Sequence, residues 1–183
     1  MSTYPGTTIE VLDLKKGSSK TLFDGIFAAG GITLSQLSTM TGLEPHVIQN
    51  WVKRKFVASP VKKLYSKEQF ARIIIINMLR ETLQIDAICN LISVIGGEVD
   101  DTTDDLIGDD ELYHRYVDMI AEENIDISDS DTVNKVVEKA TEDFKSRAVG
   151  DKRKLQRILQ VMLYAHASSR LRDNAREILS TLG

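Results

Sequence analysis

The sequence predicts a mostly α-helical protein, with a small β wing in its N-terminal half and an all-α C-terminal domain. Two observations lead to this fold class. Capping boxes, in which paired side chains satisfy backbone amides at a helix start, are expected at Thr33–Gln36 and Ser66–Gln69. After each box, apolar residues recur at the intervals of three and four that an amphipathic helix requires.

Three helices joined by tight turns are expected before residue 57. The first, over residues 21–29, is stopped by the Gly-Gly pair that follows. The second begins at the first capping box and ends at Gly42, which can supply the turn out of the helix. The third, over residues 44–55, has Pro45 at its first position, where a missing N–H leaves no bond unmade.

A wing and two further helices are expected next. The segment FVASPVKKLY, residues 56–65, is too short for another helix and is bent by Pro60, so we expect a two-stranded hairpin there. The second capping box opens a helix that runs through residue 81. Another helix, over residues 84–95, ends at a Gly-Gly pair.

The rest of the chain is expected to be helical after an acidic connector. The stretch EVDDTTDDLIGDDE reads as a solvated connector, because it combines many carboxylates with few apolar residues. Helices are expected at about 109–123, 131–147 and 151–182, and the last could break near residues 167–169.

Charge is distributed unevenly along the chain, although the net charge is only −4. Residues 1–95 hold 11 Lys and Arg against 7 Asp and Glu, residues 96–145 hold 4 against 17, and residues 146–183 hold 8 against 3. The chain is therefore basic, then strongly acidic, then basic again. Such asymmetry bears on the choice of partners rather than on the fold.

The sequence offers little for catalysis or metal binding. Its one cysteine, Cys89, excludes an internal disulfide and a thiolate cluster. The histidines lack metal-ligand or triad spacing, His166 is expected to pack, and Gly108 is misplaced for a calcium loop. We expect no enzymatic activity, cofactor or metal. No apolar run approaches a membrane span, so a cytoplasmic protein with no membrane partner is expected.

The helix expected at residues 44–55 separates into two faces when residues are placed about 100° apart around its axis. Val47, Ile48 and Trp51 fall on one side. Polar side chains fall on the opposite side, with Arg54 near the edge; they are His46, Gln49, Asn50 and Lys53. Asn and Gln can bond bidentately to adenine, and Lys can address guanine or phosphate. Lys62 and Lys63 of the wing, with Arg54, could hold the DNA backbone. The alternative is an ordinary solvated helix face.

The stretch TLSQLSTMTGLEPHVIQNWVKRKFVASPVKKLYSKEQFARIIIINMLRETLQIDAICNLI resembles the DNA-binding domain of MerR-type regulators. Thr41-Gly42-Leu43, Trp51, Pro60 and Leu64-Tyr65-Ser66 lie in register with that pattern. The phrases IQNWVKR and ARIIIINMLR also resemble an uncharacterised bacterial family described as DNA-binding, a domain of unknown function.

The MerR resemblance implies that His46, Gln49, Asn50 and Lys53 face the major groove of duplex DNA, and it puts Lys63 where such regulators carry a wing Arg. Two features depart from the pattern. The usual Arg-Tyr-Tyr or Arg-His-Tyr run is Gln49-Asn50-Trp51 here, and no heptad run follows Ile95. The expected division is a flexible tail (1–20), a winged helix-turn-helix domain (21–97), an acidic connector (98–111) and a helical C-terminal domain for dimerisation or effector binding (112–183).

The function expected from these observations is sequence-specific binding of double-stranded DNA in transcriptional regulation. The helix at 151–182 carries a broad apolar stripe, which fits packing within its domain and also a homodimer presenting two DNA half-sites. The rival is a helical protein–protein interaction or adaptor protein that retains the winged scaffold, favoured by the acidic middle segment. A small-molecule sensor is a third option, with no ligand indicated.

Overall fold

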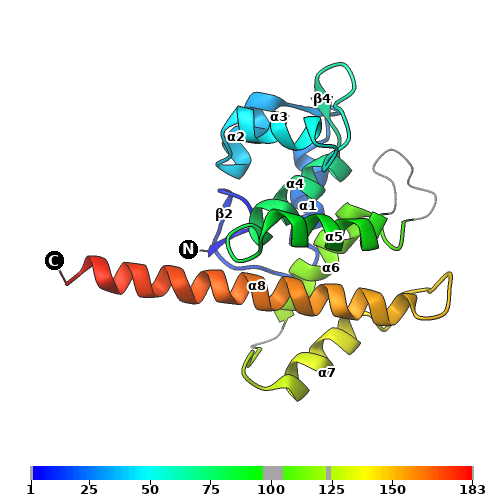
Figure 1. Ribbon diagram of the computed structural model, residues 1–183, viewed down its shortest axis with the longest axis vertical. Helices are drawn as coiled ribbons and strands as arrows, with labels where there is room; N and C mark the ends of the chain where they lie inside the picture. The colour runs from blue at the N-terminus through cyan, green and yellow to red at the C-terminus, as the bar shows by residue number, and fades with distance from the viewer. Residues whose placement is uncertain (1, 97–104, 123–124, 183) are drawn as a thin grey trace.

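Helices dominate the computed structural model, which describes residues 2–96, 105–122 and 125–182 (Figure 1). The helices are α1 (Ser18–Ile26), α2 (Leu34–Thr41), α3 (Pro45–Lys53), α4 (Lys67–Leu79), α5 (Ile85–Gly96), α6 (Asp109–Glu122), α7 (Ser130–Ala140) and α8 (Asp151–Ser180). Two short antiparallel sheets pair β1 (Ser2–Thr3) with β2 (Glu10–Val11), and β3 (Ile32–Thr33) with β4 (Leu64–Tyr65). The mostly helical fold class is confirmed.

The helix starts that were predicted from capping boxes are confirmed. At α2, the Gln36 amide N–H donates to Thr33 Oγ1, and the Thr33 amide N–H donates to Gln36 Oε1 over 2.8 Å. Gly42 ends α2 with a φ of 69°, a left-handed conformation that glycine adopts without strain. Pro45 occupies the first turn of α3, as expected. These local signals fix α2 and α3 in tandem.

The segment after α3 differs from the expected hairpin. Within residues 56–65, only Val61 and Leu64 pair with each other, and β4, which begins at Leu64, pairs with β3. Thr33 lies opposite Leu64, so this pairing joins the start of α2 to the start of α4. Gln69 holds the rest of the segment by donating from Nε2 to the carbonyl of Ala58 over 2.8 Å.

The N-terminal segment is held against the body of the protein, whereas a loose tail was expected for residues 1–20. Tyr4 is buried, and the Tyr113 hydroxyl donates to the carbonyl of Pro5 over 2.8 Å. Gly6 lies so close to α4 that a Cβ there would be 2.1 Å from the Ile74 carbonyl oxygen. The helix α1 begins at Ser18, three residues earlier than predicted. Residues 4–6 are therefore held against α4 and α6.

The helix α4 lies at the centre of the molecule and packs against α2, α6 and α8. Its four consecutive isoleucines, Ile73 to Ile76, are all buried, because neighbours surround the helix. The buried apolar residues form one cluster, which extends from Tyr4 in the N-terminal segment to Ala165 in α8. The boundaries proposed at residues 97 and 111 stay predictions.

The acidic segment is partly packed where the structure describes it. Residues 97–104, which make up most of the expected connector, lie outside the described residues. Ile107 is buried, and Asp109 at the start of α6 forms an ion pair with Arg72 of α4. A fully solvated connector was expected over residues 98–111. Residues 105–111 are instead partly packed against the body of the protein.

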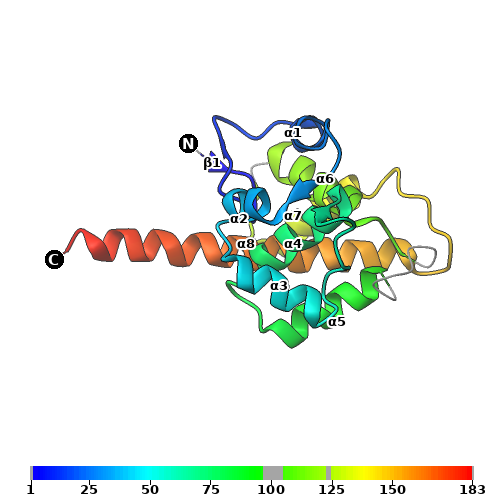
Figure 2. The same ribbon diagram turned by 90° about the horizontal axis from the view of Figure 1, so that it is seen from above.

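The C-terminal helices also differ from their predicted bounds. The helix α7 ends at Ala140, well before residue 147, and Thr141 caps it through its backbone. The helix α8 runs unbroken through residues 167–169, and its C-terminal half extends beyond the body in two perpendicular views (Figure 1, Figure 2). Among the described residues, no helix is long and apolar enough to span a membrane.

Candidate nucleic-acid interface

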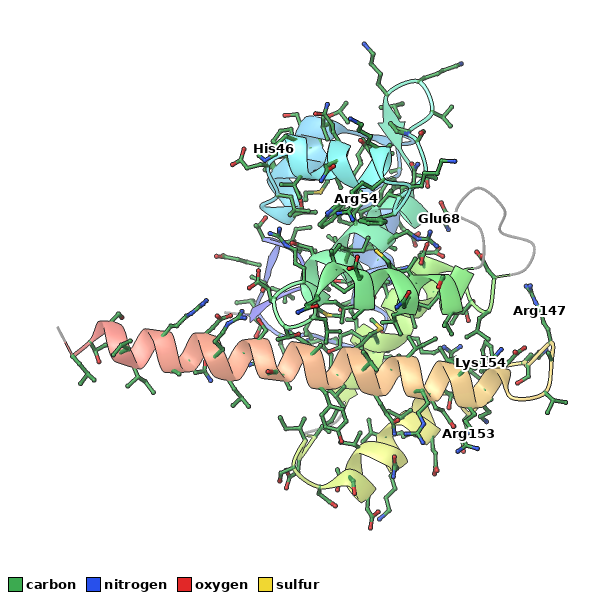
Figure 3. The ribbon with its side chains drawn as sticks, in the orientation of Figure 1. His46, Arg54, Glu68, Arg147, Arg153 and Lys154 are labelled. Carbon is green, nitrogen blue, oxygen red and sulfur yellow. The ribbon has the colours of Figure 1, made fainter. Side chains whose placement is uncertain are left out.

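The helix α3 presents the two faces that its sequence predicts. Ile48 and Trp51 are buried, and Val47 is half-buried against the core cluster. The predicted outward residues are all exposed; they are His46, Gln49, Asn50 and Lys53. Figure 3 shows His46 at the start of α3, on the side of the molecule away from α8. The helix thus docks through its apolar stripe and leaves a polar face open.

The side chains of that open face have no partners among the described residues. None of the four outward residues makes a side-chain hydrogen bond or ion pair there. Charged groups elsewhere are commonly paired. Lys67 Nζ lies 3.2 Å from Asp110 Oδ2, and Arg115 Nη1 lies 2.6 Å from Asp143 Oδ1. The donors and acceptors of α3 therefore remain available to a ligand.

Three lysines near α3 adopt left-handed backbone conformations, and in the described residues they are the only ones other than glycine with positive φ. They are Lys55 (59°), Lys62 (50°) and Lys63 (65°). A residue with a Cβ is strained there by roughly 1–2 kcal/mol, and glycine or asparagine is the usual occupant. Strained positions of this kind cluster at functional sites.

Lys62 and Lys63 occupy the tip of a tight turn closed by the Val61–Leu64 bridge. The amide N–H of Val61 donates to the carbonyl of Leu64 over 3.1 Å, and the reverse bond measures 2.9 Å. Two positive φ values in a two-residue loop define a type I′ turn, whose favoured sequence is Asn-Gly. Both lysines are exposed, so the turn carries two charges at its tip.

Lys55 is a candidate that the sequence reasoning missed. Placed within a helix over residues 44–55, it falls on the apolar side. In the structure α3 ends at Lys53, and the Phe56 amide N–H donates to the Trp51 carbonyl over 2.9 Å. This bond and the Lys55 bond to the Val52 carbonyl make a Schellman motif, which turns Lys55 outward. An exposed lysine therefore occupies the position just after the helix cap, where glycine is usual.

Arg54 is placed differently from the other predicted site residues. Its guanidinium lies 4.5 Å from the centre of the Phe56 ring, a cation–π contact. Burial raises the pKa of the Cys89 thiol in α5, and the nearby positive charge of Arg54 partly lowers it again. Figure 3 shows Arg54 between α3 and α5. Arg54 thus adds charge at the edge of the site and has an internal contact as well.

An acidic cleft lies beside the basic turn. Its volume is about 600 Å³, and it is lined by the segment after α3 on one side and by carboxylates on the other. The carboxylates are Glu68, Asp105, Asp109 and Asp110, and two arginines, Arg72 and Arg147, line the cleft as well. Burial raises the pKa of Asp109, although Arg72 opposes this by stabilising the charged form. Positive and negative surfaces therefore adjoin at the base of the turn.

The two other histidines serve the packing of the helices. His166 Nδ1 and the buried Tyr116 hydroxyl are 2.8 Å apart, and burial lowers the pKa of His166 to about 4. His114 Nδ1 lies 2.9 Å from Ser19 Oγ, and burial lowers its pKa as well. The described part of the chain holds no group of three His, Cys, Asp or Glu residues that could hold a metal ion.

Comparison with known proteins finds one family model that is similar to part of the chain. Residues 28–116 match a domain of unknown function (DUF1836), which fits the resemblance to an uncharacterised family. The match spans α2 to α5 and reaches into α6, so it includes both α3 and the Arg72–Asp109 pair. No characterised protein and no solved structure matches the chain significantly. The resemblance to MerR-type regulators rests on the sequence motifs alone.

Proposed function

We propose that this protein binds double-stranded DNA in a sequence-specific manner and regulates transcription. The observation that carries the proposal is the strained basic turn beside an unpartnered polar helix face. Lys62 and Lys63 occupy conformations that favour Asn-Gly, so their presence indicates that the charge matters more than the local stability. Phosphate neutralisation is a function for which such charge is needed.

In this proposal α2, α3 and the Lys62–Lys63 turn act as a MerR-like winged helix-turn-helix. The outward face of α3 reads base edges in the major groove, with Gln49 and Asn50 suited to adenine. Lys62 and Lys63 contact phosphates and fix the position of α3, with Lys53 and Arg54 adding charge at the helix end. The exposure of all these side chains supports this division of roles.

The experiment that tests the proposal compares base readout with phosphate contact. Duplexes bound from a random pool are sequenced, and the affinity of the selected site is measured with Asn50→Ala and Lys63→Ala variants. We expect Asn50→Ala to relax the preference at one base position, at a cost of roughly 1–3 kcal/mol. Lys63→Ala should weaken binding to all DNA sequences alike and reduce the salt dependence of binding. Equal and small effects of both changes would contradict the proposal.

The second candidate is a protein–protein adaptor that keeps the same scaffold. The acidic cleft beside the turn favours it, because its four carboxylates outnumber its two arginines, and an excess of negative charge repels DNA phosphate and suits a basic peptide. Gel retardation with random duplex at low salt separates the two candidates. Nonspecific DNA binders normally shift duplex at micromolar protein under these conditions, whereas the adaptor would leave it unshifted.

A further inference from the structure

The helix α8 carries two apolar faces, although its sequence suggests one broad stripe. The first face packs into the core, and its residues are buried; they are Leu155, Ile158, Leu159, Met162 and Leu163. The later apolar residues of the predicted stripe are exposed instead. The boundary between the two sets falls where α8 leaves the body and extends past it (Figure 1, Figure 2).

The exposed face has a heptad spacing of alternating three and four residues. Its large members are Val161, Tyr164, Leu171, Ile178 and Leu182, which are 37%, 43%, 60%, 64% and 78% exposed. Ser168 and Ala175 complete the spacing at the two intermediate positions. A 3.5-residue repeat keeps a seam facing a partner helix along its whole length. These seven residues are here called the α8 seam; six lie within α8, and Leu182 follows just after its last residue, Ser180. The α8 seam therefore has the pattern of one strand of a coiled coil.

The positions that flank the α8 seam are almost free of charge. On one side they are Gln160, Ala167, Asn174 and Thr181, and on the other Ala165, Arg172 and Leu179. The only charged member, Arg172, is bound by Glu81 of its own chain, with its Nη2 2.7 Å from the carboxylate. Flanking charges normally select partner and orientation in coiled coils. Two copies of α8 can therefore approach each other without like-charge repulsion.

The residue sizes along the α8 seam favour an antiparallel second copy. With the two-fold axis at residue 173, Leu171 faces Ala175 of the other copy, and Ile178 faces Ser168. Tyr164 then meets Leu182, just beyond the end of α8, at both ends. Each small residue meets a large one, which is how close-packed layers fill space. A parallel pair in register would put Ala175 and Ser168 against themselves and leave voids.

We propose that the α8 seam pairs with the α8 seam of a second copy of this chain in an antiparallel coiled coil. The projection of α8 leaves its C-terminal half open to a second helix, and the antiparallel arrangement puts the two bodies at opposite ends (Figure 2). The pairing does not depend on the proposed DNA binding. If both hold, the dimer presents two copies of α3 related by a two-fold axis.

The test measures the mass of the purified full chain by light scattering at about 100 µM, a concentration at which moderately tight dimers are populated. We expect twice the 20.5 kDa of one chain. Leu171→Glu and Ile178→Glu should each raise the dimer dissociation constant at least about a hundredfold, because a charge would be buried in every copy. Ser180→Glu, on the opposite side of the helix, is the matched control and should remain dimeric.

Circular dichroism checks that the variants still fold. Leu171 and Ile178 are exposed within one chain, so their variants should keep the helix content and the melting temperature of the isolated subunit. Orientation is tested by oxidation in a Cys89→Ser background. Mixed Leu171→Cys and Ala175→Cys proteins should cross-link much faster than either alone. A monomeric wild type, a dimer indifferent to both seam variants, or fastest cross-linking of Leu171→Cys to itself would overturn the proposal.

Discussion

The Nε of Arg72 in α4 lies 2.8 Å from Oδ2 of Asp109 at the start of α6, and both side chains are about nine-tenths buried. The pair joins the half of the chain that carries α3 to the C-terminal helices. Because the two residues are 37 positions apart, the contact fixes how α6 lies across α4. It is the most buried ion pair among those between described residues.

Replacing one member of this pair should destabilise the fold strongly. Asp109→Asn removes the carboxylate to which the Arg72 Nε donates, and removal of one buried partner typically costs about 3–5 kcal/mol. Asp110→Asn breaks the neighbouring pair with Lys67, whose side chain is 52% exposed, and should cost less than about 1 kcal/mol. Urea denaturation of both variants measures the difference. Equal losses would show that the burial of the Arg72 pair contributes nothing.

A glycine pair tests whether the N-terminal segment is part of the packed structure. Gly6 and Gly17 have φ values of 74° and 76°, so alanine meets similar backbone strain at both, roughly 1 kcal/mol. At Gly6 the new Cβ would also meet the Ile74 carbonyl oxygen, whereas nothing lies within 4 Å at Gly17. Gly6→Ala should therefore lower the free energy of unfolding by clearly more than Gly17→Ala. Similar losses would indicate a loosely held segment.

His166 should make stability depend on pH in a defined window. Its pKa is lowered from 6.5 to about 4, so below pH 6.5 the unfolded chain binds a proton that the folded chain does not. Stability contributed by the neutral imidazole is therefore full above pH 6.5 and is lost as the pH falls toward 4, by about 3 kcal/mol in total.

His166→Asn, which can still bond to the Tyr116 hydroxyl, supplies the comparison for this pH effect. The difference in free energy of unfolding between wild type and variant should change between pH 7 and pH 4.5, in the direction of a relative loss for wild type. Carboxylates titrate in both proteins and cancel in that difference. A constant difference across this range would contradict the assignment.

The Lys62–Lys63 turn should lower the free energy of unfolding of the protein, because both lysines have positive φ. Lys62→Asn with Lys63→Gly places the favoured type I′ residues at positive φ and should raise the free energy of unfolding by roughly 1–2 kcal/mol. The double change Lys62→Ala with Lys63→Ala removes the same charges but keeps the strain, and it should leave stability nearly unchanged. Thermal melts distinguish these outcomes. A destabilised Asn-Gly variant would show that the lysines have structural contacts of their own.

The parts of the fold that could be predicted from sequence depend on short-range signals. The capping boxes at Thr33 and Ser66, and Pro45 in the first turn of α3, act within a few residues and were confirmed. The two faces of α3 follow from its helical period, which assigns Ile48 and Trp51 to the core.

The parts that were missed depend on contacts between distant segments or on backbone conformation. The docking of Gly6 on Ile74 and the pairing of Arg72 with Asp109 cannot be predicted from the residues that neighbour each of them in the sequence. The left-handed conformation of Lys55 could not be expected, because glycine usually marks a Schellman motif. The apolar residues of α8 were assigned to one stripe, since periodicity does not show which face the body covers.

The salt dependence of duplex binding by wild type and the Lys62→Asn/Lys63→Gly variant tests the central claim most directly. Fluorescence anisotropy with a labelled duplex gives the dissociation constant at several salt concentrations. We predict micromolar or tighter binding by wild type at low salt. The variant, although more stable, should bind more weakly, with a slope of log affinity against log salt smaller by about 2. Absence of wild-type binding at micromolar protein, or identical slopes for the two proteins, would contradict the account.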